Sequence, residues 1–265
     1  RVFRIKTYEV PSTGLSAKGV AIANLLQLHP DEEITSIITH HADANDGYMF
    51  MSTLRGVVKK TSVEAYKNVR SSGLIAINLD DGDQLRWVKH TSGDDEIIIS
   101  TQQGQAIRFH ESGARPMGRV SRGVRGIRLR AGDEVIGMVI ADPEANIFVI
   151  SELGYGKRTK VSQFTAHARG GVGIRSAVVN AKTGKLMGVA SLKDGDDQEI
   201  IIISKGGQTI RLGMKNIPEI SRATQGVRIM RLKDGDSVAS MGLVKAEPED
   251  NEEESSDKVK SAEEK

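Results

Sequence analysis

The sequence contains no cysteine, only 6 prolines and few aromatic side chains, which make up 4% of its 265 residues. The absence of cysteine excludes a disulfide scaffold and a thiolate metal site. No run of about 18 consecutive apolar residues is present and no signal peptide opens the chain, so we expect a cytoplasmic protein without a membrane span. Glycine, in contrast, is abundant at 28 residues. This balance favours many short strands joined by tight turns over long helices.

Charge is distributed unevenly along the chain, although the formal net charge is only +2. Residues 245–265 hold 4 Lys and 9 Asp or Glu, which leaves 33 Lys or Arg and 26 Asp or Glu in residues 1–244. An acidic segment with so few apolar residues is typical of disorder. We expect one folded domain over residues 1–244 and a disordered acidic tail over residues 245–265. The tail either improves solubility or competes with a polyanion for the basic body.

A repeat of about fifty residues organises the folded part of the sequence. Each copy has a short apolar run that ends in serine, a turn that closes on glycine, and a second short run. The four copies lie at residues 49–61, 97–109, 148–159 and 201–212, with turn glycines Gly56, Gly104, Gly154 and Gly207. This pattern is typical of β-hairpins.

A second glycine begins a further strand between successive hairpins, and an acidic turn such as "LDDGDQL" usually follows it. We assign this second anchor to Gly19, Gly73, Gly123, Gly170 and Gly226. Each repeat therefore supplies about four strands, which predicts an all-β, propeller-like array of five to six blades with the first one truncated.

Neither the acidic turns nor the basic hairpin forms a known ligand motif. A calcium loop needs a Glu at its twelfth position, and the nearest candidate, which begins at Asp43, has Leu54 there. The segment "GYGKRT" departs from a nucleotide-binding loop, because Ser151 and Arg158 occupy the positions of the first glycine and of the hydroxyl residue. The six histidines show no metal-ligand spacing. We expect no metal, no cofactor and no catalytic residue in this chain.

Basic residues recur at fixed positions relative to both glycines. Four residues after the hairpin glycines stand Lys60, Arg108, Arg158 and Arg211. If equivalent positions share one rim of the array, they form a curved positive track that suits a polyanion backbone and carries no base-specific code. Alternatively, an exposed strand face simply favours long charged side chains. Few aromatic residues lie near these positions, which favours duplex DNA over a single strand.

The predicted DNA-contacting residues come from both sets of positions. They are Arg4, Lys18, Lys59, Lys60, Arg108, Arg115, Arg119, Arg122, Arg125, Lys157, Arg158, Arg169, Arg175, Arg211 and Arg228.

The segments "GVVKKT", "GVRGIRL", "GYGKRT" and "KGVAIANLLQL" resemble blade sequences of the C-terminal domain of the DNA gyrase A subunit, a bacterial type IIA topoisomerase. The resemblance runs from residue 1 to about residue 244. It implies a β-pinwheel, a propeller-like disc that wraps duplex DNA around its basic rim. That wrap lets the whole enzyme introduce negative supercoils at the expense of ATP.

The same resemblance implies further partners and leaves two alternatives. The partners are the rest of the gyrase A subunit, as a homodimer, and the gyrase B subunit in an A2B2 complex that uses ATP and Mg²⁺ on the chromosome. The hallmark box of the family, Gln-Arg-Arg-Gly-Gly-Lys-Gly, lies in its first blade and is missing here. We expect that the first blade is absent and that the chain begins within the second, which is cut at its start. The C-terminal domain of the topoisomerase IV A subunit, which selects DNA segments for decatenation or relaxation, is one alternative, and a blade-repeat scaffold that binds protein is the other. None of the four tyrosines has the Arg-Tyr context of the gyrase cleavage residue.

Overall fold

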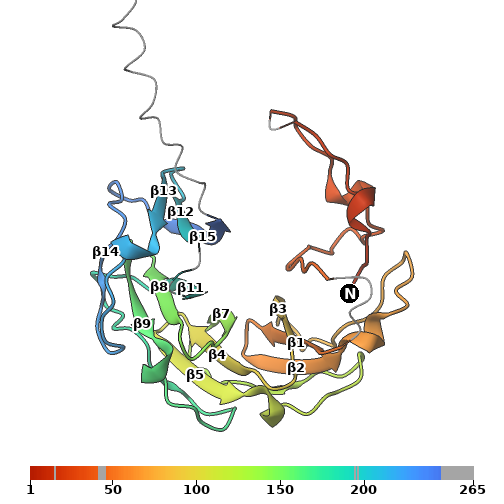
Figure 1. The fold of residues 1–265 in the computed structure, drawn as a ribbon, viewed down its shortest axis with the longest axis horizontal. Coiled ribbons are helices and arrows are strands. Elements are labelled where there is room, and N and C mark those ends of the chain that lie inside the picture. The colour runs from red at the N-terminus through yellow and green to blue at the C-terminus, as the bar shows by residue number, and fades with distance from the viewer. Residues whose placement is uncertain (15, 41–45, 194, 196, 246–265) are drawn as a thin grey trace, which may run out of the picture.

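The computed structural model describes residues 1–14, 16–40, 46–193, 195 and 197–245 (Figure 1). Four antiparallel sheets follow one another along an open arc, and the described residues contain short 3-10 turns but no α-helix. The prediction of an all-β, propeller-like array is confirmed. The predicted acidic tail falls almost entirely on residues 246–265, outside the described residues, and stays a prediction.

Each sheet is built around one hairpin. The first sheet has the order β3-β1-β2-β6, with β1 (Tyr48–Thr53), β2 (Val57–Ser62), β3 (Leu85–Thr91) and β6 (Val124–Arg125). The second has the order β10-β5-β4-β7, with β4 (Glu96–Thr101), β5 (Gln105–His110), β7 (Val135–Ile140) and β10 (Ile174–Arg175). The third has the order β11-β8-β9-β14, with β8 (Asn146–Ser151), β9 (Tyr155–Lys160), β11 (Leu186–Leu192) and β14 (Val227–Arg228).

The fourth sheet and the 3-10 turns complete the described chain. The order of the fourth sheet is β13-β12-β15, with β12 (Gln198–Ser204), β13 (Thr209–Gly213) and β15 (Val238–Lys245). The turns are η1 (Thr7–Glu9), η2 (Ile22–Asn24), η3 (Val63–Tyr66), η4 (Glu111–Gly113), η5 (Val161–Gln163) and η6 (Met214–Asn216).

The outermost strand of each of the first three sheets is donated by the next repeat. β6 lies between β5 and β7 in sequence but pairs with β2, and likewise β10 pairs with β5 and β14 with β9. An isolated bridge joins Val2 to Leu74 in the same manner. Among the described residues of 1–40, which hold the predicted truncated unit, this bridge is the one β-type backbone pairing. This strand exchange ties neighbouring blades together.

The glycine that begins each donated strand has no room for a side chain. Gly123, Gly173 and Gly226 have φ values of 105°, 77° and 83°. A Cβ would lie 2.5 Å from a backbone oxygen of the accepting strand at Gly123, 2.6 Å at Gly226 and closer still at Gly173. The sequence assignment of this anchor to Gly170 was therefore wrong by three residues. Gly170 also has a positive φ, but its nearest heavy atom would be 3.4 Å away.

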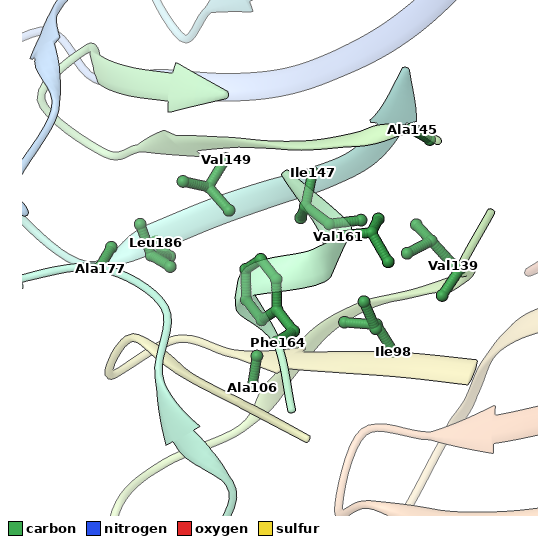
Figure 2. Close-up of a cluster of buried hydrophobic side chains, with 11 residues drawn as sticks. Ile98, Ala106, Val139, Ala145, Ile147, Val149, Val161, Phe164, Ala177 and Leu186 are labelled. Atoms are coloured by element: carbon green, nitrogen blue, oxygen red, sulfur yellow. The ribbon is translucent and has the colours of Figure 1, made fainter. Parts of the chain in front are cut away.

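Apolar side chains fill the space between successive sheets. Figure 2 shows the cluster between the second and third sheets, where Ile98 faces Ile147 and Val149, and Phe164 from the loop after η5 closes the cluster. The intervening residues of β8, Phe148 and Ile150, belong to the cluster shared with the fourth sheet. Both faces of an inner blade are thus buried, which explains why its first strand is a continuous apolar run.

Candidate nucleic-acid interface

Three of the predicted DNA contacts are interior residues. Lys59, Lys60 and Lys157 are 0%, 3% and 1% exposed. Lys60 Nζ lies 3.2 Å from Oε2 of the buried Glu111, and Nζ also lies 4.5 Å from the ring centroid of Tyr48. The expectation that these lysines present free cations on a rim is wrong, because segments of the next repeat lie over all three, and Ala76 of the same repeat also contacts Lys59.

Lys59 and Lys157 occupy equivalent positions on β2 and β9, three residues after the hairpin glycine, and each binds main-chain oxygens. Lys59 Nζ donates to the Ala76 oxygen at 2.6 Å and to the Arg119 oxygen. No carboxylate contacts either ammonium group among the described residues. Burial, and secondarily a nearby arginine, lowers the pKa of each lysine to about 8.

The contacts of Lys157 all lie in one loop of the next repeat. Its Nζ donates to the Ser221 oxygen at 2.8 Å, to the Arg222 oxygen, and to Thr224 Oγ1 at 3.2 Å. The lysine therefore fastens this loop to the blade beneath it.

Two further members of the predicted column, Arg108 and Arg158, bind main-chain oxygens of the next repeat and so connect neighbouring blades. Arg108 Nη1 donates to the main-chain oxygens of Val161 and Phe164, at 3.1 and 3.2 Å, and its guanidinium pairs with Glu96. Arg158 Nε donates to the Ile217 oxygen at 2.9 Å. In both cases a strand residue caps the 3-10 turn of the next repeat.

Arg211 belongs to the same column but to the last sheet. It is exposed, pairs with Glu199, and donates from Nη2 to the Lys245 oxygen at 3.2 Å. The basic position does recur in every hairpin, as predicted. Its side chains, however, mainly form contacts between neighbouring blades.

A different set of arginines lies on the outer edge of the sheets. The donated strands β6, β10 and β14 each end in an exposed arginine: Arg125, Arg175 and Arg228. With the corrected anchor glycine, all three stand two residues after it. Arg228 lies against Tyr155, with Nη2 3.1 Å from the tyrosine Oη. These residues were predicted as DNA contacts, and the structure gives them the repeated exposed placement that the other column lacks.

A second repeated arginine lies in the loops that lead to the donated strands. We name these the crossover loops, residues 116–122, 166–172 and 219–225; each begins at a residue bridged to the preceding blade. Four residues before the anchor glycines stand Arg119, Arg169 and Arg222.

Two of these loop arginines reach the preceding donated strand. Arg169 Nη1 donates to the Arg125 oxygen at 3.0 Å, and Arg222 Nη1 donates to the Arg175 oxygen. Arg222 was missed by the sequence prediction, because the misplaced anchor at Gly170 put the three loops out of register. Their common spacing to the correct glycine was the signal that would have found it.

The other predicted contacts are scattered. Arg4 and Lys18 are exposed in the first 40 residues, where Arg4 Nη1 donates to the Lys67 oxygen at 3.2 Å. Arg115 is exposed and directly precedes the first crossover loop. Arg122 is exposed but lies 2.7 Å from Asp80 Oδ1, so its charge is partly compensated.

The acidic turns have a structural role of their own. Asp83, Asp133 and Asp236 each accept an N–H from the neighbouring hairpin turn, at 3.0, 2.9 and 2.9 Å. Within the described residues, no group of three or more His, Cys, Asp or Glu side chains is placed to hold a metal ion. No helix in that part of the chain has the length and apolar character needed to span a bilayer.

Comparison with known proteins decides the family. The family model described as "DNA gyrase C-terminal domain, beta-propeller" matches residues 1–41, 47–92, 95–142, 145–193 and 198–245. The chain belongs to this family. The five matched segments follow the truncated unit and the four sheets in order. The predicted resemblance to the gyrase A C-terminal domain is confirmed.

Two curated relatives are both gyrase A subunits. The DNA gyrase A protein of Staphylococcus epidermidis is 37% identical over 250 residues, which cover 93% of this chain and 28% of that protein. The DNA gyrase A protein of Staphylococcus aureus is 38% identical over 261 residues, which cover 97% of this chain and 29% of that protein. The chain thus spans less than a third of the length of these relatives.

Two solved structures share the fold. One is the DNA gyrase A C-terminal domain, with a TM-score of 0.75 and 26% identity over 89% of this chain and 76% of that one. The other is the C-terminal domain of DNA topoisomerase IV, with a TM-score of 0.78 and 28% identity over 86% of this chain and 71% of that one.

Proposed function

We propose that this chain binds duplex DNA without sequence preference along the outer edge of its arc and bends it with a fixed hand. The observation that carries the proposal is the repeated exposed arginine on the exchanged strands, Arg125, Arg175 and Arg228. Equivalent residues on consecutive blades of an arc form a curved row of positive charge. Such a row contacts phosphates at intervals and draws a duplex around the edge.

The side chains on this edge suit backbone contact rather than base readout. Arginine pairs well with phosphate oxygens, whereas sequence readout requires side chains that enter a groove and match base edges. The row lies on two-residue strands at the outside of the sheets, with Arg169 and Arg222 bonded behind it to the main chain. The expected outcome is uniform affinity for unrelated sequences and strong dependence on salt.

In the whole enzyme, the wrap serves ATP-dependent negative supercoiling by DNA gyrase. The rest of the gyrase A protein, as a homodimer, cleaves and rejoins DNA, and the gyrase B protein completes an A2B2 complex that uses ATP and Mg²⁺. We place this complex in the cytoplasm, on the chromosome. In this complex the present chain binds and bends duplex DNA and supplies no catalytic group.

A topoisomerase IV role is the second candidate. It is favoured by one observation, the TM-score of 0.78 with the C-terminal domain of that enzyme against 0.75 with the gyrase domain. In that case the same edge selects DNA segments for decatenation or relaxation, and no net wrap of one hand is needed.

A topology assay tests the proposal and separates the candidates. Relaxed plasmid is bound by the 265-residue chain, treated with a nicking-closing enzyme and stripped of protein. A linking-number shift of constant sign that grows with protein concentration is the expected result for gyrase-type wrapping. Binding without any shift favours the topoisomerase IV candidate, and no binding at low salt rejects both.

A further inference from the structure

The three crossover loops rest on different residues. At the equivalent position of β2, β5 and β9, three residues after the hairpin glycine, stand Lys59, Ile107 and Lys157. The first and third crossover loops therefore lie over a buried ammonium group, and the second lies over an isoleucine. The second loop is also glycine-rich, and Gly171 approaches Ile107.

The buried ammonium groups fix the orientation of one peptide plane in each loop. Lys59 donates to the main-chain oxygen of Arg119, and Lys157 donates to that of the equivalent Arg222. No peptide bond among the described residues is cis. In a trans peptide the N–H of the next residue points opposite to the carbonyl. The N–H groups of Val120 and Ala223 therefore point away from the lysine and the blade.

These two N–H groups are available to a ligand. Val120 is 58% exposed, and Ala223 is exposed as well. Neither N–H has an acceptor among the described residues. An exposed amide without a protein partner bonds to water, so an anion with better acceptors can replace that water.

The second loop provides an internal comparison. Its residue at the same position is Gly170, whose N–H donates to the Gly126 oxygen at 2.6 Å. Where isoleucine replaces the lysine, the corresponding N–H is thus used within the protein. The outward amide accompanies the buried lysine in both loops that have one.

The charge around the two amides favours an anion. Each amide lies directly after an arginine, Arg119 or Arg222, and above a lysine that is contacted by neutral oxygens. A buried positive charge is screened less by salt than a surface charge, so its field persists at the loop.

The carboxylates next to these loops are engaged by other cations. Asp80 pairs with Arg122 at 2.7 Å in the first crossover loop. Glu219, which begins the third crossover loop, pairs with Lys160 at 3.6 Å. Each loop therefore keeps a positive balance beside its outward amide.

We propose that crossover loops 116–122 and 219–225 are phosphate-binding sites, in which the main-chain N–H groups of Val120 and Ala223 donate to phosphate oxygens of the duplex backbone. Lys59 and Lys157 are positioning residues that keep these amides turned outward. Loop 166–172 is not such a site. The inference rests on the proposed DNA binding and adds two defined main-chain contacts to the arginine row.

Amide signals measured by NMR test the proposal directly. The ¹⁵N-labelled chain is titrated with a duplex of about 20 base pairs, with inorganic phosphate, and with chloride at matched ionic strength. We expect the Val120 and Ala223 signals to move downfield with duplex and with phosphate, and neither to move with chloride. The Gly170 signal stays in place throughout.

The other outcomes are distinct. Duplex binding that leaves the Val120 and Ala223 signals unchanged overturns the inference and leaves the proposed function standing. Movement with inorganic phosphate but not with duplex shows sites for the free ion and also overturns it. Absence of duplex binding at low salt rejects the proposed function itself.

Two single variants test the role of the lysines within one molecule. In Lys157→Met the Ala223 response to phosphate should fall at least severalfold while the Val120 response persists, and in Lys59→Met the pattern should reverse. The unaffected loop serves as the control for folding in each case. An undiminished response beside the substituted lysine contradicts the positioning role, and if either variant fails to fold the titration of the unsubstituted chain decides.

Discussion

At the scale of single residues, the same side-chain type serves two purposes that the sequence does not separate. Arg108 and Arg175 are both strand arginines in a repeated column. Arg108 is half-buried and caps a turn of the next repeat, whereas Arg175 is exposed on the outer edge. Their substitution should therefore affect different properties of the protein.

Arg108→Met should lower the free energy of unfolding by about 2 kcal/mol, because charged hydrogen bonds to two main-chain oxygens are lost. Its duplex affinity, measured where both proteins are folded, should stay the same. Arg175→Met should weaken duplex binding with little change in stability. Chemical denaturation and fluorescence titration check the pair, and a reversed pattern would restore Arg108 to the DNA-contacting set.

The buried lysines make the stability depend on pH. Because burial lowers the pKa of Lys59 and Lys157 from 10.5 to about 8, the folded state releases these protons before the unfolded state does. Below pH 8 the cost of burying both charges is fully present, and between about pH 8 and 10.5 the free energy of unfolding should rise by at most about 1.4 kcal/mol per pH unit per lysine. In the Lys157→Met variant the free energy of unfolding, measured by chemical denaturation at a series of pH values, should rise less steeply with pH over this window. Equal slopes for the two proteins would contradict the assignment.

At the scale of elements, the donated strand decides how the repeat is aligned. The third repeat offers several glycines close together, "RGGVG", and the sequence pattern alone does not say which one starts the strand. The pairing of Ile174 with Ala106 selects Gly173. That choice brings all three edge arginines, and all three loop arginines, into register.

Glycine-to-alanine substitutions at the two candidate anchors should differ in cost. At Gly173 the new Cβ meets the Ala106 backbone at a positive φ, so we expect destabilisation by roughly 3 kcal/mol from strain and overpacking. At Gly170 the nearest atom is 3.4 Å away, and only the strain of the positive φ of about 1 kcal/mol remains. Thermal unfolding of the two variants checks the order. A larger loss at Gly170 would argue against the corrected alignment.

At the scale of the whole molecule, the edge arginines act together through their spacing. The triple variant Arg125→Gln, Arg175→Gln, Arg228→Gln should lower the magnitude of the log–log salt slope of duplex binding by about 0.9 for each phosphate contact removed. The affinity should fall similarly for unrelated DNA sequences. A matched control, Arg86→Gln, Lys89→Gln, Lys205→Gln, removes equal charge from exposed residues off this edge and should change the slope little.

Two results of the slope measurement would count against the row. Equal slopes for the edge variant and the unsubstituted chain would remove these residues from the interface. Equal losses in the edge variant and its control would mean that net charge, rather than placement on the arc, governs binding. A protein-binding scaffold, the alternative from another functional class, predicts no salt-steep duplex binding in any of the proteins.

The sequence by itself determined the repeat, the class of fold and the family. Hairpin glycines with apolar runs and serines at fixed spacing dictate strands and turns locally, and the four copies each became one sheet. These features depend on neighbouring residues, so a linear pattern is enough to find them. The second-anchor glycines also placed Arg125, Arg175 and Arg228 among the predicted basic contacts, and all three are exposed, although Arg175 was aligned to the wrong glycine, Gly170.

Only the tertiary structure decided which basic residues face solvent. Lys60 and Lys157 lie on strands with the same local pattern as an exposed strand residue. Both are nevertheless buried, because strand exchange brings a segment of the next repeat against them. The partner segments lie about 50 or more residues away in sequence, as with Lys157 and Ser221, so no local pattern encodes the contact. Burial depends on how blades are joined, and that is a property of pairing between distant segments rather than of the repeat itself.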